Sequence, residues 1–215
     1  MSLVAGTEYQ ETSTKAPAPP RMAYEEFLDW ADDGTSAEWI NGEVIFMGPA
    51  SRQHQELIVS LSSLLTFFVQ WHRLGTIFVA PFQMKTGPDL PGREPDILFI
   101  GRDHLDRIKN TYLDGPADLA VEIVSVDSLT RDRTEKYREY EQGGVREYWL
   151  IDPLHHQAEF YHLGDDGSYY PIRIGEDHIF YSRVLPGLWL DLDWLWLESG
   201  PLLIPALQAW GFVKT

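Results

Sequence analysis

The 215-residue sequence contains no cysteine and no long apolar run. The absence of cysteine excludes disulfides, thiolate metal ligands and a cysteine nucleophile, and it suits a reducing cytoplasm. The most apolar stretch of the tail, residues 201–213, is too short to span a bilayer and is interrupted by Pro205. Residues 1–20 carry no apolar signal segment. We therefore expect a soluble, cytoplasmic protein that has no membrane as a partner.

Basic residues are also scarce. The chain has 17 Lys and Arg residues against 33 Asp and Glu residues, so its formal net charge is −16. Proteins that bind nucleic acid mainly through phosphate neutralisation usually present a basic face. The charge therefore argues against a protein that coats DNA nonspecifically. It argues less against an enzyme with a carboxylate-rich site, because a bound metal ion inverts the local potential.

The order of apolar runs and turn residues predicts one domain over residues 21–215, preceded by a disordered, Pro-rich lead over residues 1–20. Asn41-Gly42 between two short apolar runs predicts a β-hairpin. Helices are expected over residues 22–30, 51–73 and 131–142, and strands over 38–40, 44–46, 76–79, 82–85, 97–100, 119–124, 147–151, 158–163, 169–174, 178–184 and 188–192. This pattern indicates a mixed α/β sheet with two main helices.

A carboxylate lies inside one of the strands that should be buried. Glu122 shares a strand face with Ala120 and Val124, and Asp96 stands at the head of another strand. A buried charge is costly unless it is paired or binds a metal. Two carboxylates on neighbouring strand ends can hold Mg²⁺ or Mn²⁺, and Lys136 in the following helix could orient an attacking water.

These residues, in this order, resemble the PD-(D/E)XK nuclease superfamily, and specifically its restriction-endonuclease-like family called Uma-two. Pro95-Asp96 resembles the PD element, and Glu122-Ile123-Val124 resembles the (D/E)XK element with Val124 in place of lysine. In that family a lysine of the next helix, here Lys136, is taken to replace it. Further similar segments span roughly residues 22–195, including 38–43, 51–55, 144–149 and 185–187. By the same resemblance, Glu43 would be an additional acidic residue of the site.

The resemblance implies a restriction-endonuclease-like core with extra C-terminal β-hairpins. It also implies a metal-dependent endonuclease acting on DNA, in which Asp96 and Glu122 bind Mg²⁺ or Mn²⁺ and Lys136 orients the water. A homodimer is plausible, because cutting both strands needs two sites.

Each of these residues also has a structural interpretation. Asp96 can cap local N–H groups, Glu122 can form a structural ion pair, and Lys136 can pair with a residue one helical turn earlier. Glu43 beside a turn can simply be solvated, and we expect His54 to be structural or to support a ligand. The protein can then be a noncatalytic interaction module that retains the fold; a two-carboxylate glycoside hydrolase is a third alternative, but it leaves Lys136 without a role.

Overall fold

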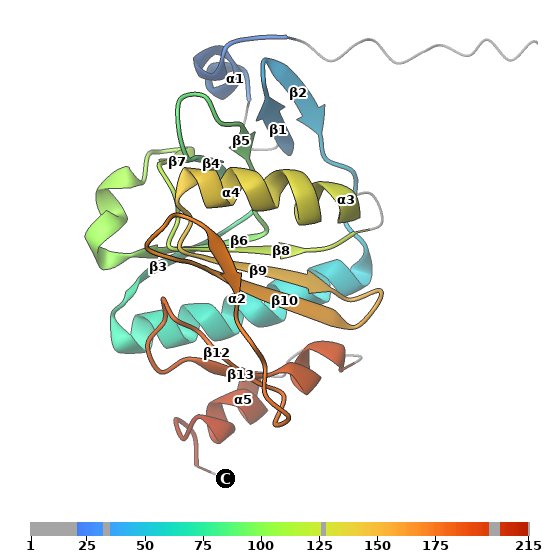
Figure 1. Cartoon of the computed structure of the whole chain (residues 1–215), viewed down its shortest axis with the longest axis vertical. Helices are drawn as coiled ribbons and strands as arrows, with labels where there is room; N and C mark the ends of the chain where they lie inside the picture. Colours follow the sequence, from blue (N-terminus) through green and yellow to red (C-terminus); the bar gives the residue numbers. More distant parts are fainter. Residues whose placement is uncertain (1–20, 32–34, 126–127, 198–202, 215) are drawn as a thin grey trace, which may run out of the picture.

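A computed structural model describes residues 21–31, 35–125, 128–197 and 203–214. Its centre is a six-stranded mixed sheet with the order β11-β10-β9-β8-β6-β3 (Figure 1). The strands of this central sheet are β3 (Gly75–Val79), β6 (Ile97–Gly101), β8 (Leu119–Ile123), β9 (Glu147–Asp152), β10 (Gln157–Leu163) and β11 (Tyr169–Pro171). Only β8 and β9 run parallel in it. The predicted mixed sheet is confirmed, whereas the expected lead over residues 1–20 lies outside the described residues.

Helix α2 (Arg52–His72) covers one face of the central sheet (Figure 1). It begins after Ser51, whose hydroxyl accepts a hydrogen bond from the backbone N–H of His54, and it ends at Arg73 in the left-handed conformation. Its buried stripe of Leu, Val and Phe side chains packs against the residues of β6 and β8 that point to this face. The sequence placed both ends of this helix correctly to within one or two residues.

The opposite face is covered by a second helix, which consists of α3 (Leu129–Arg131), a π-helical turn (Asp132–Lys136) and α4 (Tyr137–Gly143). Gly144 ends it in the left-handed conformation, with φ at 85°. The helix connects the parallel strands β8 and β9, which is the usual way to join such strands. The sequence predicted this helix, but not the turn of wider pitch inside it.

A smaller sheet with the order β2-β1-β5-β4-β7 lies beside α3 and α4 (Figure 1). Its strands are β1 (Ala37–Ile40), β2 (Glu43–Phe46), β4 (Gln83–Lys85), β5 (Gly92–Arg93) and β7 (Tyr112–Asp114), and helix α1 (Tyr24–Trp30) packs against it. The hairpin turns at Asn41 and Gly42, with positive φ values of 51° and 88°, as their sequence predicts. The short 3-10 helix η1 (Arg102–Arg107) follows β6.

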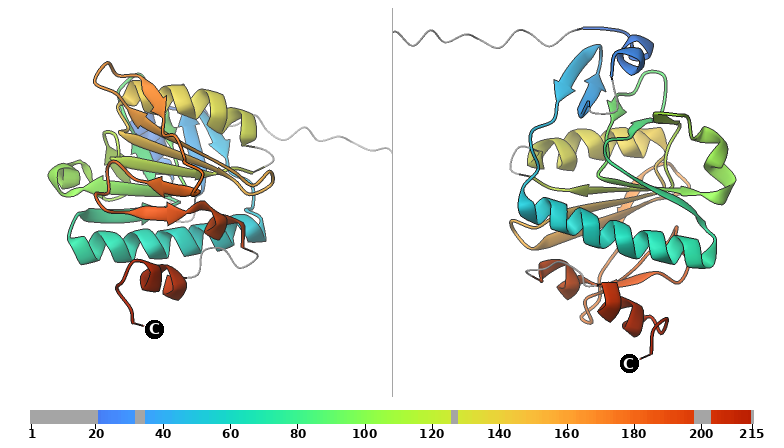
Figure 2. Two further views of the ribbon diagram at one scale, coloured as in Figure 1. Left: turned by 60° about the horizontal axis from the view of Figure 1, so that its bottom comes forward. Right: turned by 180° about the vertical axis from the view of Figure 1, so that it is seen from behind.

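The C-terminal part adds the hairpin of β12 (Ile179–Tyr181) and β13 (Trp189–Asp191), the 3-10 helix η3 (Leu192–Trp196) and helix α5 (Leu203–Ala209). The hairpin extends the α2 side of the core, where Phe180 stacks on Phe160 at 3.9 Å between ring centroids. Helix α5 packs on α2 (Figure 2), where Trp210 contacts Phe68 at 5.6 Å. In the part of the chain that the structure describes, no helix is long and apolar enough to cross a membrane.

Candidate metal and catalytic site

The ends of β6 and β8 bring Asp96 and Glu122 together. These strands are antiparallel, and Ile97 lies opposite Val121. One residue beyond this pair, the same register places Asp96 opposite Glu122, where Cα atoms are about 5 Å apart. The Asp96 carboxylate also accepts a hydrogen bond from the backbone N–H of Ile123 at 2.7 Å. The structure therefore brings the two predicted metal ligands side by side.

Glu122 is almost completely buried on the face of β8 that α4 covers, with 3% of its surface exposed. Its Oε1 accepts a hydrogen bond from the Tyr140 hydroxyl at 2.6 Å and lies 2.8 Å from the Lys136 ammonium. Burial raises the Glu122 pKa to about 8, while Lys136 opposes the shift and the neighbouring Asp132 carboxylate adds to it. The surroundings of the Glu122 carboxylate therefore favour the binding of a proton or of a cation.

Lys136 joins three carboxylates. Its Nζ lies 2.8 Å from Glu122, 3.0 Å from Glu38 and 3.5 Å from Asp132. Burial alone would lower the Lys136 pKa, but the charges of Glu122 and the other two carboxylates outweigh burial and raise it. Asp132 and Lys136 bound the π-helical turn, a distortion that occurs frequently at functional sites. Lys136 is therefore a permanently charged centre of the cluster.

Glu38 enters the cluster from the small sheet. It is fully buried, and its Oε2 lies 2.7 Å from the guanidinium of Arg93 on the neighbouring strand β5. Burial would raise the Glu38 pKa, but Lys136 and Arg93 outweigh it and lower the pKa to about 2. Arg93 continues to Glu139 of α4 at 2.7 Å. Ion pairs of Arg93 therefore connect the small sheet to the second helix at the site.

His54, in the first turn of α2, contacts the other side of Asp96. Its Nε2 lies 3.3 Å from Asp96 Oδ2. Burial would lower the His54 pKa, but the hydrogen bond and charge of Asp96 outweigh it and raise it. His54 Nδ1 is buried and has no partner among the described residues. This geometry fits the expectation that His54 is structural or supports a metal-binding residue, here Asp96.

Glu43 lies apart from the charged cluster. The structure puts it at the hairpin tip, where it pairs with Arg21 and its side chain is 40% exposed. Glu43 lies opposite Ile40, two residues beyond Glu38, so it is about 7 Å further along the hairpin. The sequence identified the correct hairpin, but the carboxylate that reaches Lys136 is Glu38.

The sequence alone suggests no role for Glu38, Arg93 or Tyr140. Glu38 carried a usable signal, because a Glu beside Trp39 in a short strand can point to the buried side of a sheet. Arg93, in a strand of two residues after a turn, carried none. The link from Lys136 to Asp132 was anticipated only as an ordinary ion pair between neighbouring helical turns.

The donor set suits a hard divalent cation. Asp96 Oδ1 and Glu122 Oε2 make no hydrogen bond to any described residue, and the buried Asp132 Oδ1 also has no hydrogen-bond partner there. Mg²⁺ is usually held by one or two carboxylates, with water and substrate phosphate completing its shell. Within the described ranges, no group of three or more His, Asp or Glu side chains is arranged to hold a metal. The residues therefore suit a metal site with two carboxylate ligands, and not one in which protein side chains supply every ligand.

Comparisons with known proteins agree with this picture of the fold. A crystal structure described as a "putative nuclease belonging to DUF820" from Anabaena variabilis superposes with a TM-score of 0.66 at 19% identity. The match covers 81% of this chain and 97% of that one, and shows the nuclease-like fold. Two uncharacterized proteins of Synechocystis are each 27% identical, over 70% and 65% of this chain and 78% and 80% of their own lengths.

The family model described as "Putative restriction endonuclease", Uma2, matches residues 24–193. That range includes both main helices, both sheets and every residue of the charged cluster. The central sheet with one helix on each face is a restriction-endonuclease-like core. The chain belongs to the Uma2 family, and the expected nuclease-like fold is confirmed.

Proposed function

We propose that the protein is a Mg²⁺- or Mn²⁺-dependent endonuclease that hydrolyses phosphodiester bonds of DNA. The observation that supports this most is the pairing of Asp96 and Glu122 across β6 and β8, with free carboxylate oxygens and Lys136 beside them. Membership of a family of nuclease-like proteins makes a nucleic acid the expected substrate. The proposal includes a cytoplasmic location and, for cutting both strands, a homodimer.

In this proposal each residue has a distinct task. Asp96 and Glu122 hold the metal, which when bound would polarise the phosphate and lower the pKa of a bound water. Lys136 fixes Glu122 at 2.8 Å and orients the attacking water. Tyr140 donates a hydrogen bond to the same Glu122 oxygen at 2.6 Å, so the other carboxylate oxygen would be the one available to a metal. His54 positions Asp96 from the α2 side.

The charge of the cluster supports a cationic cofactor. Among the described residues, Lys136, Arg93 and Arg131 are the cations that pair with Glu38, Glu122, Asp132 and Glu139, with Arg131 at 4.0 Å from Glu38. The fifth carboxylate, Asp96, pairs with His54. If all five carboxylates were ionised and His54 neutral, they would exceed these cations by two, and the raised pKa of Glu122 reflects its burial together with this crowding of carboxylates. A divalent cation offsets this excess and attracts a phosphate that the net charge of −16 would otherwise repel.

Calorimetric titration of the intact protein with Mn²⁺ and Mg²⁺ tests the metal site. We expect binding to the wild type, and its loss in Glu122→Gln and Asp96→Asn. Glu159→Gln is the matched control, because Glu159 is a partly exposed carboxylate on β10 that pairs with Arg133 away from the cluster. Circular dichroism establishes that each variant is folded.

The same variants are then assayed for cleavage of double- and single-stranded DNA. Loss of cleavage in Asp96→Asn and Glu122→Gln, with Glu159→Gln active, is the expected result. Cleavage that survives both substitutions in the site contradicts the assignment.

The burial of Glu122 also favours a second candidate, a noncatalytic interaction module that keeps the nuclease fold. In that case Lys136 and Tyr140 serve as a structural network that satisfies a buried carboxylate. Metal-free protein that binds a nucleic acid or protein partner, with no metal binding and no cleavage, is the result that would favour this alternative.

A further inference from the structure

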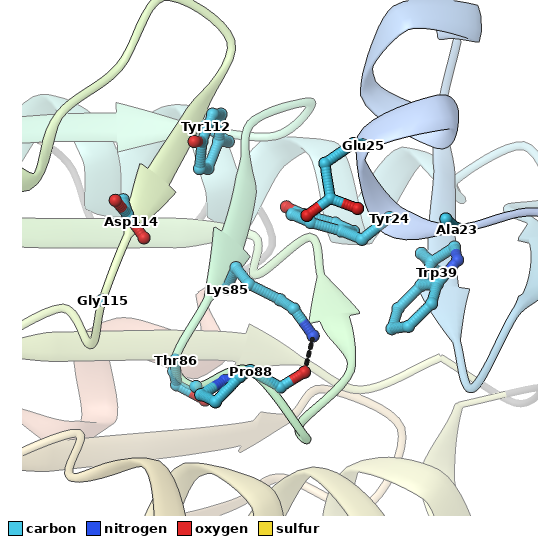
Figure 3. A pocket seen from close by; sticks show the side chains of 11 residues that line it. Ala23, Tyr24, Glu25, Trp39, Lys85, Thr86, Pro88, Tyr112, Asp114 and Gly115 are labelled. Carbon is cyan, nitrogen blue, oxygen red and sulfur yellow. Dashed lines mark hydrogen bonds between the residues drawn. The ribbon is translucent and has the colours of Figure 1, made fainter.

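A cavity lies behind the charged cluster, on the opposite face of the small sheet. It has a volume of about 520 Å³, and its walls come from α1, β1, β4, β7 and the turn after β4 (Figure 3). Successive residues of a strand point to opposite faces. Glu38 and Arg93 point to the cluster, whereas Trp39 lines the cavity and Gly92 lies under the Tyr24 ring.

Lys85 of β4 is an unusual buried cation in this cavity. Only 9% of it is exposed, and no carboxylate among the described residues lies within 4 Å of its Nζ. The other two buried cations, Arg93 and Lys136, each contact at least two carboxylates. The charges of Glu25, which lines the cavity, and Asp89 act on this ammonium only from beyond 4 Å, so Lys85 lacks a direct counterion, which is costly for a buried charge.

The contacts of Lys85 satisfy its ammonium only in part. It donates hydrogen bonds to the carbonyl oxygens of Pro88, at 3.2 Å, and Leu90, and it lies over the rings of Tyr24 and Trp39 at 5.0 and 4.6 Å. An ammonium has three N–H donors, so one remains for a ligand. Figure 3 shows the Lys85 side chain extending through the centre of the pocket.

The walls add aromatic surface and a second unsatisfied group. Tyr24 and Tyr112 meet edge to face at 6.1 Å between centroids, and both line the cavity. The Tyr24 hydroxyl is buried and has no hydrogen-bond partner in the described part of the chain. A cavity of this size, with aromatic walls and few polar groups, falls within the range of small-ligand sites.

The acidic residues at the rim narrow the choice of ligand. Glu25 and Asp114 both line the cavity (Figure 3). Their charges disfavour a phosphate in the pocket, but carboxylates accept N–H donors. A fitting ligand is therefore planar and neutral, with a carbonyl oxygen for Lys85 and N–H groups for a carboxylate.

We propose that this pocket binds an unpaired nucleobase that carries a carbonyl group, with guanine as the best match. Guanine presents O6 as an acceptor for Lys85 and N–H donors for Asp114 or Glu25, whereas adenine has no carbonyl oxygen. Enzymes that bind extruded bases read them through polar edges between aromatic side chains. The inference rests on the proposed function, because it assigns the pocket to the nucleic acid that the enzyme would cut.

The test is calorimetric titration of the full chain with guanosine and with adenosine, in buffer without divalent metal. We expect guanosine to bind at least about tenfold more tightly than adenosine, because a hydrogen bond from a charged donor to the carbonyl oxygen contributes about that factor to affinity. Lys85→Met should lower guanosine affinity about tenfold or more and leave adenosine unchanged. Lys214→Met, an exposed lysine outside the pocket, is the matched control.

Asp114→Asn is the second variant, because the Asp114 side chain is 59% exposed and its change leaves the core intact. It should also weaken guanosine binding. Equal affinity for both nucleosides, no guanosine binding by folded wild type near the solubility limit, or unchanged affinity in both Asp114→Asn and Glu25→Gln would each overturn the proposal. DNA cleavage without guanosine binding removes only this inference, whereas guanosine binding without cleavage under any metal condition leaves the pocket and removes the nuclease activity.

Discussion

Replacing Lys136 by Met should destabilise the protein strongly, because it removes the positive centre of the cluster and keeps the side-chain volume. Lys136 is 1% exposed and lies within 3.5 Å of three buried carboxylates, Glu38, Glu122 and Asp132. Breaking a buried ion pair from one side costs about 3–5 kcal/mol, since it leaves the partner uncompensated. For a protein of 150–250 residues this corresponds to a fall in Tm of roughly 6–20 °C.

The loss should be partly reversible. Adding Glu38→Gln to Lys136→Met removes the stranded carboxylate that Lys136 helps to keep ionised, so we expect the double variant to recover at least about 1 kcal/mol of unfolding free energy. Urea denaturation monitored by circular dichroism measures both variants. The control is Arg138→Met, an exposed cation on the same helix, which should change stability by less than about 0.5 kcal/mol. A Lys136→Met variant as stable as Arg138→Met would refute the electrostatic account of the cluster.

The remaining predictions concern three other places. Cleavage by Glu38→Gln should fall at least tenfold while Glu43→Gln keeps more than half of wild-type activity, because only Glu38 contacts Lys136; equal loss in both returns Glu43 to the site. Asp118 accepts hydrogen bonds that, against the opposing effect of burial, hold its pKa below its usual value. The ionised Asp118 carboxylate therefore stabilises the fold fully above about pH 4, and this stabilisation is lost as pH falls through the lowered pKa. At pH 7 we expect Asp118→Asn to unfold at a lower urea concentration than the wild type, and the difference in urea midpoint should become smaller on acidification. Phe180→Ala should cost about 3–5 kcal/mol, because a fully buried ring leaves a cavity, whereas Tyr181→Ala on the same strand, 60% exposed, should be near neutral in the same titration.

Much of the fold was predictable because local signals and burial agree. The Asn41-Gly42 turn, the Ser51 cap and the apolar stripe of α2 are each encoded within a few residues, and the structure has all three. The alternation along β8 correctly separated the face with Glu122 from the face that packs on α2.

The errors arise where distant segments meet. Strands predicted over residues 169–174 and 178–184 are only three residues long in the structure, because pairing with β10 and β13 stops there. The choice between Glu38 and Glu43 depends on how far the hairpin tip extends beyond Lys136, which no local pattern records. No local pattern predicts the π-helical turn either, which carries both Asp132 and Lys136.

The way the small sheet is attached has a consequence for the order in which the molecule opens. The hairpin of β1 and β2 packs with α1 in an apolar cluster of only four buried residues among those described, and β1 joins α4 through Glu38, Arg93 and Glu139. By contrast, β4 and β7 pack into the apolar core beneath α4 through Met84 and Leu113. Segments with little apolar contact exchange their amide protons by local opening well below the global unfolding energy. Amides of β1 and β5 should therefore exchange before those of β8 and β9, so the strand carrying Glu38 separates from the carboxylates of the central sheet while the rest of the protein stays folded. Local unfolding of the native protein would then separate β1 from the central sheet at the site, and any cation bound there would slow this opening.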